Sequence, residues 1–393
     1  MKVLHVNNQI RLGGAETVIR QLLRGFPTAR LAVADGKTFP REVVALYPRL
    51  LARLAHTRFH RQIERLAPRA RWTDRAFEAL ADSPYDLIHL HNFHGRYARI
   101  ETLARLARRK PVVWTFHALW GITGGCDHPR DCRRYLDQCG ECPQLGRWPL
   151  GLEDHTAEQL ARKRELLASL PLHIVAPSRW LAQKVKNSPV GRNWSVHHLP
   201  NAVDADFLRA LPPRVFPSQE TILIVNRNFA DEQKGFPIIL DALTRLKPGP
   251  RLILVGENSA AAAQSLPGWD CESLGYVASP AELARIHARA DLFLFASPAE
   301  NFPCAVLEGM AAGSCVVATP TGGVVEQIEH GVSGLLAREI SGAALSEMLL
   351  QALTDRGRRE RLGRTAKERV EREFSEEVFF TRHRNLYAEV LAA

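Results

Sequence analysis

The chain has 393 residues and a mass of 43.9 kDa, which is enough material for two compact domains of ordinary size. Hydrophobic residues make up 46% of it and charged residues 24%, and these globular fractions exclude a disordered, collagen-like or coiled-coil protein. The formal net charge of +10 leaves two kinds of anionic partner to consider, nucleic acid and an anionic membrane surface.

Short apolar runs alternate with amphipathic stretches along nearly the whole chain. The runs predicted to form strands are residues 2–7, 31–34, 86–90, 112–116, 172–176, 221–226, 251–255, 291–296 and 315–318. The stretches predicted to form helices are residues 15–24, 98–109, 153–169, 178–187, 237–246, 280–290 and 303–312. Nearly continuous apolar strands separated by helices are typical of parallel sheets covered on both faces, so we predict a doubly wound α/β fold.

A break in this alternation falls within residues 199–219, which are rich in proline and keep no periodicity. We therefore predict one Rossmann-like domain over residues 1–205, a second over residues 220–375, and a C-terminal helix over residues 376–393. We expect the two domains to face each other across a cleft, with ligands at the carboxyl ends of the strands.

The sequence also suggests where the protein works. No uncharged apolar run approaches the roughly 20 residues that a membrane-spanning helix needs. The first residues are typical of a strand rather than of a signal peptide. We expect a cytoplasmic protein, and the seven cysteines, an odd number, are expected to be reduced thiols.

The positive charge is concentrated in one region. Residues 41–110 contain fifteen basic and seven acidic residues, a net +8. Within this region residues 49–66 alternate Leu51, Leu54, Phe59, Ile63 and Leu66, at helical spacing, with Arg49, Arg53, Arg58, Arg61 and Arg65. Such a helix suits an anionic membrane surface, and an ordinary helix packed on its domain is the alternative. No motif of a nucleic-acid-binding protein accompanies the charge, so we do not expect nucleic acid as a partner.

Two glutamates stand eight positions apart in the second half of the chain. Glu300 follows the predicted strand 291–296, and Glu308 lies on the next predicted helix. Both can face the crevice at the carboxyl end of the sheet, and the amino end of that helix suits a phosphate group. The pattern is therefore compatible with a site for a phosphorylated ligand.

The segment around these glutamates resembles a known signature. After Glu300 and Glu308 it contains Ala311, Ala312, Gly313, Gly322, Gly323, Glu326, Gly331 and Gly334. Residues 297–335 resemble the E-x7-E signature of family 4 of the retaining GT-B glycosyltransferases. Further landmarks of this family occur in the same order at residues 13–16, 200–204 and 234–235. The resemblance covers essentially the whole chain and implies an N-terminal acceptor domain and a C-terminal donor domain.

The resemblance implies roles for several donor-site residues. Lys234 and Arg227 match the cations that bind the diphosphate of a UDP- or GDP-sugar. Such cations neutralise the charge that grows on the leaving phosphate as the glycosidic bond breaks. The family also implies a same-face displacement, in which the departing phosphate takes the acceptor proton and no divalent metal is required.

The two glutamates are assigned in the same way. Glu308 matches the residue that holds the ribose hydroxyls, and Glu300 matches the residue that contacts the donor sugar. The backbone around Asn301 and Phe302 is implied to hold sugar hydroxyls.

Two further site elements are expected in the N-terminal domain. Gly13 and Gly14 lie between the first strand and the first helix, where glycine allows a phosphate or an acceptor to approach the backbone closely. His117 follows the predicted strand 112–116 and matches a family histidine near the donor sugar. Many relatives have Asp after this histidine, whereas this chain has Ala118, so a base role for that Asp is not carried over.

Two clusters of potential metal ligands remain. Cys126, Cys132, Cys139 and Cys142 lie within seventeen residues, in an insertion over residues 121–145 that resembles one in relatives linked with exopolysaccharide and lipopolysaccharide assembly. Four thiolates suit a structural zinc ion, and reduced core thiols are the alternative. His89, His91 and His94 could also bind a metal, although histidines at the end of a strand are the commoner interpretation.

These observations predict a glycosyltransferase. We expect it to move a hexosyl group, with retention, from a nucleotide-diphosphate sugar to a saccharide acceptor, linked to polyprenyl pyrophosphate, in bacterial surface polysaccharide synthesis. It would work in the cytoplasm or as a peripheral protein on the inner face of the membrane. The alternatives are a nucleotide-sugar epimerase of the same fold and a non-catalytic, zinc-containing module that binds nucleic acid or membranes.

Overall fold

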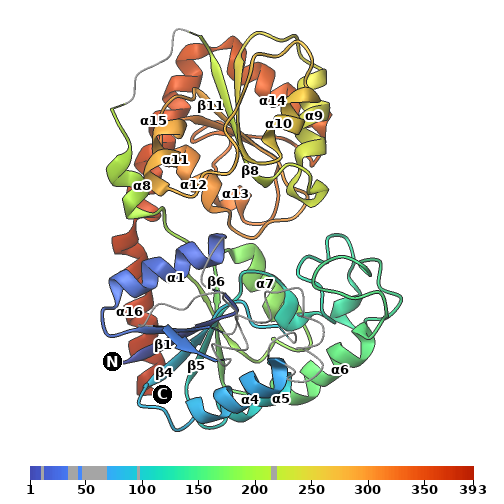
Figure 1. Cartoon of the computed structure of the whole chain (residues 1–393), viewed down its shortest axis with the longest axis vertical. Helices are drawn as coiled ribbons and strands as arrows, with labels where there is room; N and C mark the ends of the chain where they lie inside the picture. The colour runs from blue at the N-terminus through green and yellow to red at the C-terminus, as the bar shows by residue number, and fades with distance from the viewer. Residues whose placement is uncertain (10–12, 34–42, 47–68, 95–97, 214–218) are drawn as a thin grey trace. The chain divides into compact units, whose positions relative to one another are not determined.

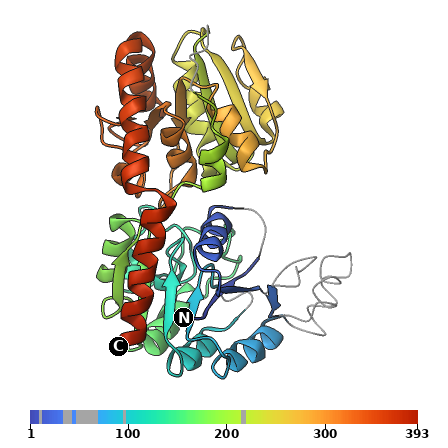
Figure 2. The same cartoon turned by 90° about the vertical axis from the view of Figure 1, so that its left-hand side faces the viewer.

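A computed structural model describes residues 1–9, 13–33, 43–46, 69–94, 98–213 and 219–393. The chain divides into two compact units (Figure 1). Unit 1 contains Met1–Leu199 together with Phe380–Ala393, and unit 2 contains Pro200–Phe379. Each unit is built around one parallel sheet with helices on both of its sides (Figures 1 and 2). The predicted fold class, with two doubly wound Rossmann-like domains, is therefore confirmed.

The described part of unit 1 has a seven-stranded sheet in the order β3-β2-β1-β4-β5-β6-β7. Its strands are β1 (Val3–Asn7), β2 (Arg30–Val33), β3 (Val43–Ala45), β4 (Leu87–Leu90), β5 (Val112–Thr115), β6 (Leu172–Ala176) and β7 (Ser195–His198). Its helices are α1 (Gly14–Gly25), α4 (Arg69–Leu80), α5 (Ile100–Ala107), α6 (Thr156–Leu167) and α7 (Arg179–Asn187), with short 3₁₀ turns η1 (Trp120–Ile122) and η2 (Arg134–Leu136).

The described part of unit 2 has a six-stranded sheet in the order β10-β9-β8-β11-β12-β13. Its strands are β8 (Thr221–Asn228), β9 (Arg251–Glu257), β10 (Cys271–Ser273), β11 (Leu292–Phe295), β12 (Cys315–Ala318) and β13 (Leu335–Leu336). Its helices are α8 (Ala205–Ala210), α9 (Phe236–Thr244), α10 (Ser259–Gln264), α11 (Pro280–His287), α12 (Cys304–Ala311), α13 (Val324–Gln327), α14 (Gly342–Thr354) and α15 (Arg356–Glu373), with the 3₁₀ turn η3 (Glu232–Lys234). Helix α16 (Glu376–Ala392) ends the chain.

Side chains alternate between the two faces of each strand, and in unit 2 both faces are apolar. On one face Ile222, Leu294 and their neighbours pack under α9 and α14. On the other face Leu223 and Phe293 pack under α11, α12 and α15. Unit 1 differs, because its large apolar cluster lies on one face, whereas buried histidines occupy the opposite face near α16.

The units divide the chain differently from the predicted domains. Residues 200–205, predicted to belong to the N-terminal domain, lie in unit 2. There the Asn201 Nδ2 donates to the Phe302 carbonyl at 3.0 Å, and the Val203 N–H donates to the Phe374 carbonyl at 3.0 Å. The last part of α16 belongs to unit 1 (Figure 2), where the Tyr387 hydroxyl lies 2.7 Å from the His89 Nδ1. Both differences arise from contacts between residues that are far apart in the sequence.

Candidate functional site

In a doubly wound sheet the ligand site forms where the strand order reverses, which in unit 2 is between β8 and β11. Lys234 follows β8 in η3, and Glu300 lies in the loop after β11. The Lys234 Nζ is 3.3 Å from the Glu300 Oε1, and the two side chains are 38% and 21% exposed. The structure therefore brings together, in one partly exposed ion pair, two residues that are 66 positions apart.

The backbone on both sides of this pair is tightly fitted. The Asn226 Nδ2 donates to the Lys234 carbonyl at 3.0 Å. Gly235 has a φ of +78°, and a Cβ at this position would lie 2.1 Å from the Ala296 carbonyl oxygen. Only glycine allows this left-handed turn to sit directly against the end of β11. The glycine after Lys234 is therefore a requirement of the local geometry.

The Glu300 loop is held from three directions. The Gly323 N–H donates to the Asn301 carbonyl at 2.7 Å, and the Asn201 Nδ2 donates to the Phe302 carbonyl. The side chains of Asn301 and Phe302 are buried. Gly322, with a φ of +53°, lies so close that a Cβ would be 1.9 Å from the Glu300 carbonyl oxygen. The loop is thus fixed by backbone contacts, which leaves the Glu300 carboxylate to face the partly exposed site.

We predict that Gly322→Ala displaces the Glu300 loop. The variant should therefore bind the nucleotide sugar expected from the sequence less tightly and transfer its sugar more slowly. Alanine must adopt a positive φ and clash with a backbone carbonyl, so a cost of about 1–3 kcal/mol to local structure is expected. The matched control is Gly331→Ala, because Gly331 also has a positive φ (+77°) but no atom lies within 4 Å of its added Cβ. The loss of ligand-induced stabilisation in a thermal melt should be confined to Gly322→Ala. Equal losses in both variants would contradict a role for this close contact.

Glu308 lies on α12. The residues that surround it in the folded protein could not be predicted from the sequence. Its Oε2 is 4.0 Å from the Nε2 of His287, and its side chain is 16% exposed. Burial and then the charge of Asp204 raise the pKa of Glu308 to about 7. His287 is fully buried, neither ring nitrogen has a hydrogen-bond partner among the residues that the structure describes, and burial lowers its pKa to about 3. At neutral pH Glu308 is therefore poised between its two protonation states beside a neutral imidazole.

In unit 1 a chain of histidines runs from the sheet to a pocket. The His5 Nδ1 is 3.1 Å from the His91 Nε2, and the His91 Nδ1 is 3.2 Å from the His117 Nε2. His91 and His117 line this pocket together with Asn8 and other residues at the ends of β1, β4 and β5, and Trp148 adds a wall from a later segment. Each imidazole therefore fixes the tautomer of the next one.

The histidines of this hydrogen-bonded row, and His89 beside it, are uncharged at physiological pH. Burial lowers the pKa of His5 to about 3 and that of His117 to about 4. Burial and the neighbouring histidines also hold the pKa values of His89 and His91 well below 6.5. A neutral His117 can donate or accept a hydrogen bond at the pocket without carrying a charge.

Comparison with known proteins identifies the family of this two-unit structure. Residues 212–369 match the family model described as "Glycosyl transferases group 1". Residues 12–207 match the one described as "Glycosyltransferase Family 4". The chain belongs to the family 4 type of glycosyltransferases. The structure of Anabaena Alr3699/HepE in complex with UDP and glucose has a TM-score of 0.70 at 18% identity, over 99% of this chain and 100% of that one, and so shares the GT-B fold.

Curated relatives of this glycosyltransferase include proteins of polysaccharide synthesis. WcaC of Escherichia coli K12, named for colanic acid biosynthesis, is 23% identical over 59% of this chain and 59% of its own length. The N,N'-diacetylbacillosaminyl-diphospho-undecaprenol alpha-1,3-N-acetylgalactosaminyltransferase of Campylobacter jejuni is 29% identical over 40% of this chain and 42% of its own length. The matches therefore span less than two thirds of these relatives.

Three other residues were predicted to belong to the site of this glycosyltransferase. The structure gives their positions but does not test their roles. Arg227 is exposed near the end of β8, where the register with β9 shifts. Gly13 has a φ of 137° and caps α1 without a side-chain hydrogen bond, and Gly14 is the first residue of that helix. The roles of Arg227, Gly13 and Gly14 remain predictions.

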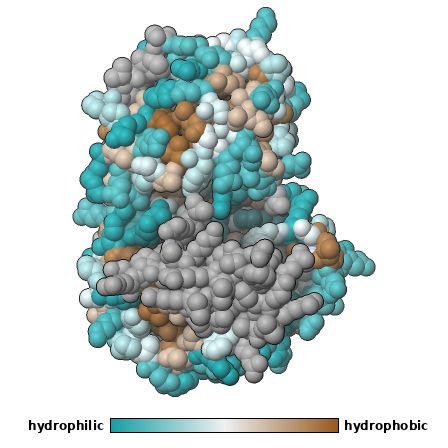
Figure 3. Space-filling model, viewed as in Figure 1, coloured by the Kyte–Doolittle hydropathy of each residue, from teal (hydrophilic) through white to brown (hydrophobic). Residues whose placement is uncertain are grey.

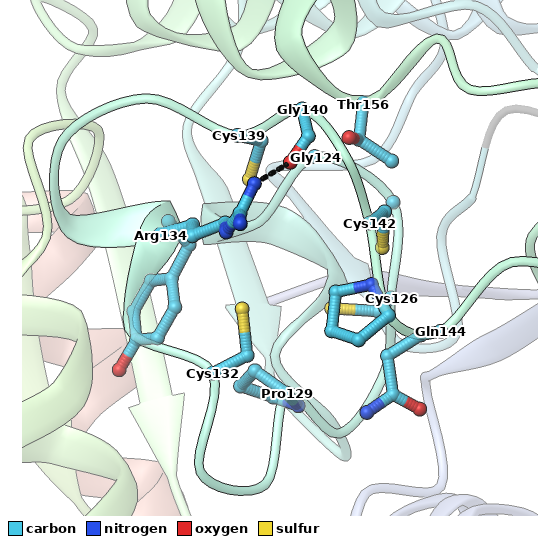
Figure 4. Close-up of a pocket in the computed structure, with 13 residues that line it drawn as sticks. Gly124, Cys126, Pro129, Cys132, Arg134, Cys139, Gly140, Cys142, Gln144 and Thr156 are labelled. Atoms are coloured by element: carbon cyan, nitrogen blue, oxygen red, sulfur yellow. Dashed lines mark hydrogen bonds between the residues drawn. The ribbon is translucent and has the colours of Figure 1, made fainter.

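The structure also places the two clusters of potential metal ligands. Among the described residues, the set whose ligand atoms all lie within 4.8 Å is His5, His89 and His91. His94 is not part of this set, and β1 supplies its third member, which agrees with the preferred interpretation that His89, His91 and His94 are not a metal-binding set of their own. The four sulfurs of Cys126, Cys132, Cys139 and Cys142 do not form a set this compact, although they line one pocket (Figure 4).

The predicted membrane contact is not tested by the structure. The basic helix expected over residues 49–66 lies outside the described residues. Among the helices that are described, none combines the length and the apolar character needed to cross a bilayer. In the view of Figure 3 the described surface is mainly hydrophilic, with small separate hydrophobic areas.

Proposed function

We propose that this glycosyltransferase moves a hexosyl group from a UDP- or GDP-sugar, with retention of configuration, to a saccharide acceptor carried by a polyprenyl pyrophosphate lipid. The product would enter a bacterial surface polysaccharide. The observation that carries the proposal is the Lys234–Glu300 pair at the strand-order reversal of unit 2. The complexes of HepE with UDP-glucose, and the names of WcaC and the Campylobacter enzyme, support the donor and acceptor classes.

The donor would be held by residues of unit 2. Lys234 lies opposite the leaving diphosphate, where its ammonium stabilises developing negative charge. Glu300, 3.3 Å from it, accepts hydrogen bonds from the sugar hydroxyls. Backbone N–H groups around Asn301 and Phe302 add contacts to the sugar, and the Glu308 carboxylate holds the ribose.

The remaining predicted residues would complete the site. Arg227 adds a second cation for the diphosphate. Gly13 and Gly14 let a phosphate or the acceptor approach the amino end of α1. His117, neutral and hydrogen-bonded to His91 at 3.2 Å, orients the transferred sugar without adding charge.

The transfer itself requires one bond to form and one to break. The acceptor oxygen bonds to the anomeric carbon on the face from which the nucleotide departs, while the bond from that carbon to the β-phosphate oxygen breaks. The acceptor proton passes to the departing phosphate. Positioning and electrostatic stabilisation then supply most of the rate, and the scheme requires no metal cofactor.

The test is a donor screen with membrane-derived acceptor. We expect one UDP- or GDP-sugar to raise the melting temperature, because binding to the folded state stabilises it, and the same donor to support transfer. Glu300→Ala and Glu308→Ala should abolish or strongly reduce transfer, while Glu371→Ala, exposed on α15, should not. The anomeric configuration of the product, read by NMR, tests retention.

Three results would overturn the proposal. One is that no UDP- or GDP-sugar binds or reacts. Another is that all three glutamate variants retain full transfer. Conversion of the donor in the absence of any acceptor would identify an epimerase instead. A lipid-linked acceptor also requires a peripheral protein on the inner face of the cytoplasmic membrane, so the protein should sediment with anionic lipid vesicles.

A further inference from the structure

The segment from Gly124 to Gln144 folds around four cysteines. Cys126, Cys132, Cys139 and Cys142 line one pocket of unit 1, and Figure 4 shows their sulfurs directed toward a common space. All four are free, partly buried thiols. Three of the seven cysteines lie elsewhere, in unit 2, so more than half of the thiols of the chain converge in one short loop.

The hydrogen bonds of the loop described next join backbone groups and side chains other than the cysteines, and the four thiols face the pocket. The Thr123 hydroxyl donates to the Cys126 carbonyl at 2.7 Å, and the Cys142 N–H donates to the Asp154 carboxylate at 2.8 Å. Arg134 donates to the Gly140 carbonyl at 2.6 Å, the bond drawn in Figure 4. The one regular element within the loop is the turn η2. A segment with so little regular structure commonly depends on a disulfide or a metal ion for its order.

Next to this loop lies a buried cation, Lys163 of α6, which is 1% exposed. Its ammonium donates to the carbonyls of Trp120 at 2.5 Å and Thr123 at 2.9 Å, and it lies 3.4 Å from the centre of the Trp120 ring. Burying an ammonium group is costly unless an anionic group is near. Of the groups near Lys163 that can carry a negative charge, Asp127 is a carboxylate, whereas Cys126 and Cys139 are thiols that carry a charge only when deprotonated.

We propose that Cys126, Cys132, Cys139 and Cys142 bind one Zn²⁺ ion as thiolates, and that Lys163 is the charge partner of this site. Each thiol loses its proton on binding, so a divalent ion with four thiolates has a net charge of −2, which adds to the counter-charge that Asp127 gives the buried ammonium. Tetrahedral sulfur coordination favours zinc among the common ions.

Binding draws the loop inward. With zinc–sulfur bonds of about 2.3 Å in tetrahedral geometry, the sulfurs come within about 4 Å of one another, closer than in this structure. Gly125 and Gly140, with φ values of +137° and +128°, give the loop backbone angles that other residues rarely adopt. The loop therefore has the pocket and the backbone freedom to close on an ion.

The ion would support the pocket that contains His117. Lys163 binds carbonyls of the segment after His117, and the Leu119 N–H donates to the Asp127 carbonyl at 2.9 Å, next to Cys126. The pocket is lined by Ala118, Trp120 and Asp127 from the same stretch. The zinc site is thus structural, and its effect on transfer would be indirect.

The first test measures metal in the full chain, purified without chelators. We expect one zinc per chain by elemental analysis, and X-ray absorption with four sulfur ligands at about 2.3 Å rather than nitrogen ligands at about 2.0 Å. Cys139→Ser and Cys142→Ser should lose most of the zinc, whereas Cys271→Ser and Cys304→Ser, partly buried thiols outside the loop, should keep it.

Several outcomes would overturn the proposal. They are metal-free protein with four free thiols, disulfides within the loop, an iron–sulfur chromophore, or zinc with nitrogen ligands, which would point to His5, His89 and His91. If the cysteine variants fail to fold, the wild-type chain still decides, because a thiol-reactive mercurial should release one zinc per chain as the four loop thiols react, and the other three of the seven thiols should release none.

A second test concerns Lys163. Lys163→Met should weaken zinc binding about 10-fold or more, which is the size of effect that supporting residues commonly have at metal sites. Lys186→Met, exposed on α7, is the matched control. Unchanged zinc affinity in Lys163→Met would overturn the assignment of Lys163 as the charge partner, while leaving the donor-binding test of the proposed function unaffected.

Discussion

Replacing Lys234 with alanine is expected to lower kcat/KM for sugar transfer by about 10²–10³-fold, the usual effect of removing one group that stabilises developing negative charge. The expectation rests on the position of its ammonium, 3.3 Å from the Glu300 Oε1 at the carboxyl ends of β8 and β11. Binding of the nucleotide diphosphate should weaken as well, since the cation is lost in both the ground state and the transition state. Steady-state kinetics and the nucleotide-induced shift in melting temperature measure the two effects.

The control is Lys247→Ala, which removes an exposed lysine after α9. Lys234→Ala should fold normally, because a partly exposed ion pair contributes about 1 kcal/mol or less to stability. Lys234→Arg should recover part of the activity, since the charge is kept while the geometry changes. Full activity in Lys234→Ala, with a melting temperature close to that of the wild type, would contradict the placement of the diphosphate.

The sequence predicted the central strands of both sheets but not their edge strands. All nine predicted strands have counterparts among the described strands, and the four that were not predicted are β3, β7, β10 and β13. These four are the edge strands of the two described sheets. Central strands are buried on both faces and therefore need continuous apolar runs. Edge strands are short and partly exposed, so Ser195–His198 and Cys271–Ser273 have no such signature.

Site residues close to a strand end could be predicted, whereas their partners could not. Glu300 and Lys234 lie in the segments that come after predicted strands 291–296 and 221–226, and their meeting follows from the order of a doubly wound sheet. The His287–Glu308 contact depends on how α11 packs against α12. The contact between His5 and His91 joins β1 to the end of β4 across 86 residues. No local pattern contains such pairings, which only the tertiary packing of the elements determines.

The packing of α16 against unit 1 also depends on contacts between residues that are far apart in the sequence. The sequence predicted a terminal helix with no strand after it. It did not show that Tyr387 would bond to His89, or that the ring of Phe380 would lie against Gly25. These contacts make the end of the chain part of the first unit. A domain boundary drawn from composition alone assumes that each domain is continuous in sequence, and here that assumption fails.

Acidification from pH 7.5 to pH 5 is expected to destabilise unit 1 by several kcal/mol. His5 and His117 have pKa values of about 3 and about 4 in the folded protein, against about 6.5 when unfolded. Between these values the unfolded chain binds more protons, so stability falls as the pH drops below about 6.5. Each histidine contributes about 2 kcal/mol at pH 5, and His89 and His91 act in the same direction. Asp127, with a pKa raised to about 6 by burial, acts in the opposite direction.

A variant isolates the histidine contribution. His5→Phe keeps a ring of similar size that does not titrate, so between pH 7.5 and pH 5 the wild type should lose about 2 kcal/mol more stability than this variant. Urea unfolding followed by tryptophan fluorescence reports mainly on unit 1, which contains six of the seven tryptophans. His155→Gln, whose side chain is 63% exposed, should keep the wild-type dependence on pH. The explanation fails if His5→Phe loses as much stability on acidification as the wild type, because a buried neutral His5 would then contribute nothing to the acid sensitivity of the sheet.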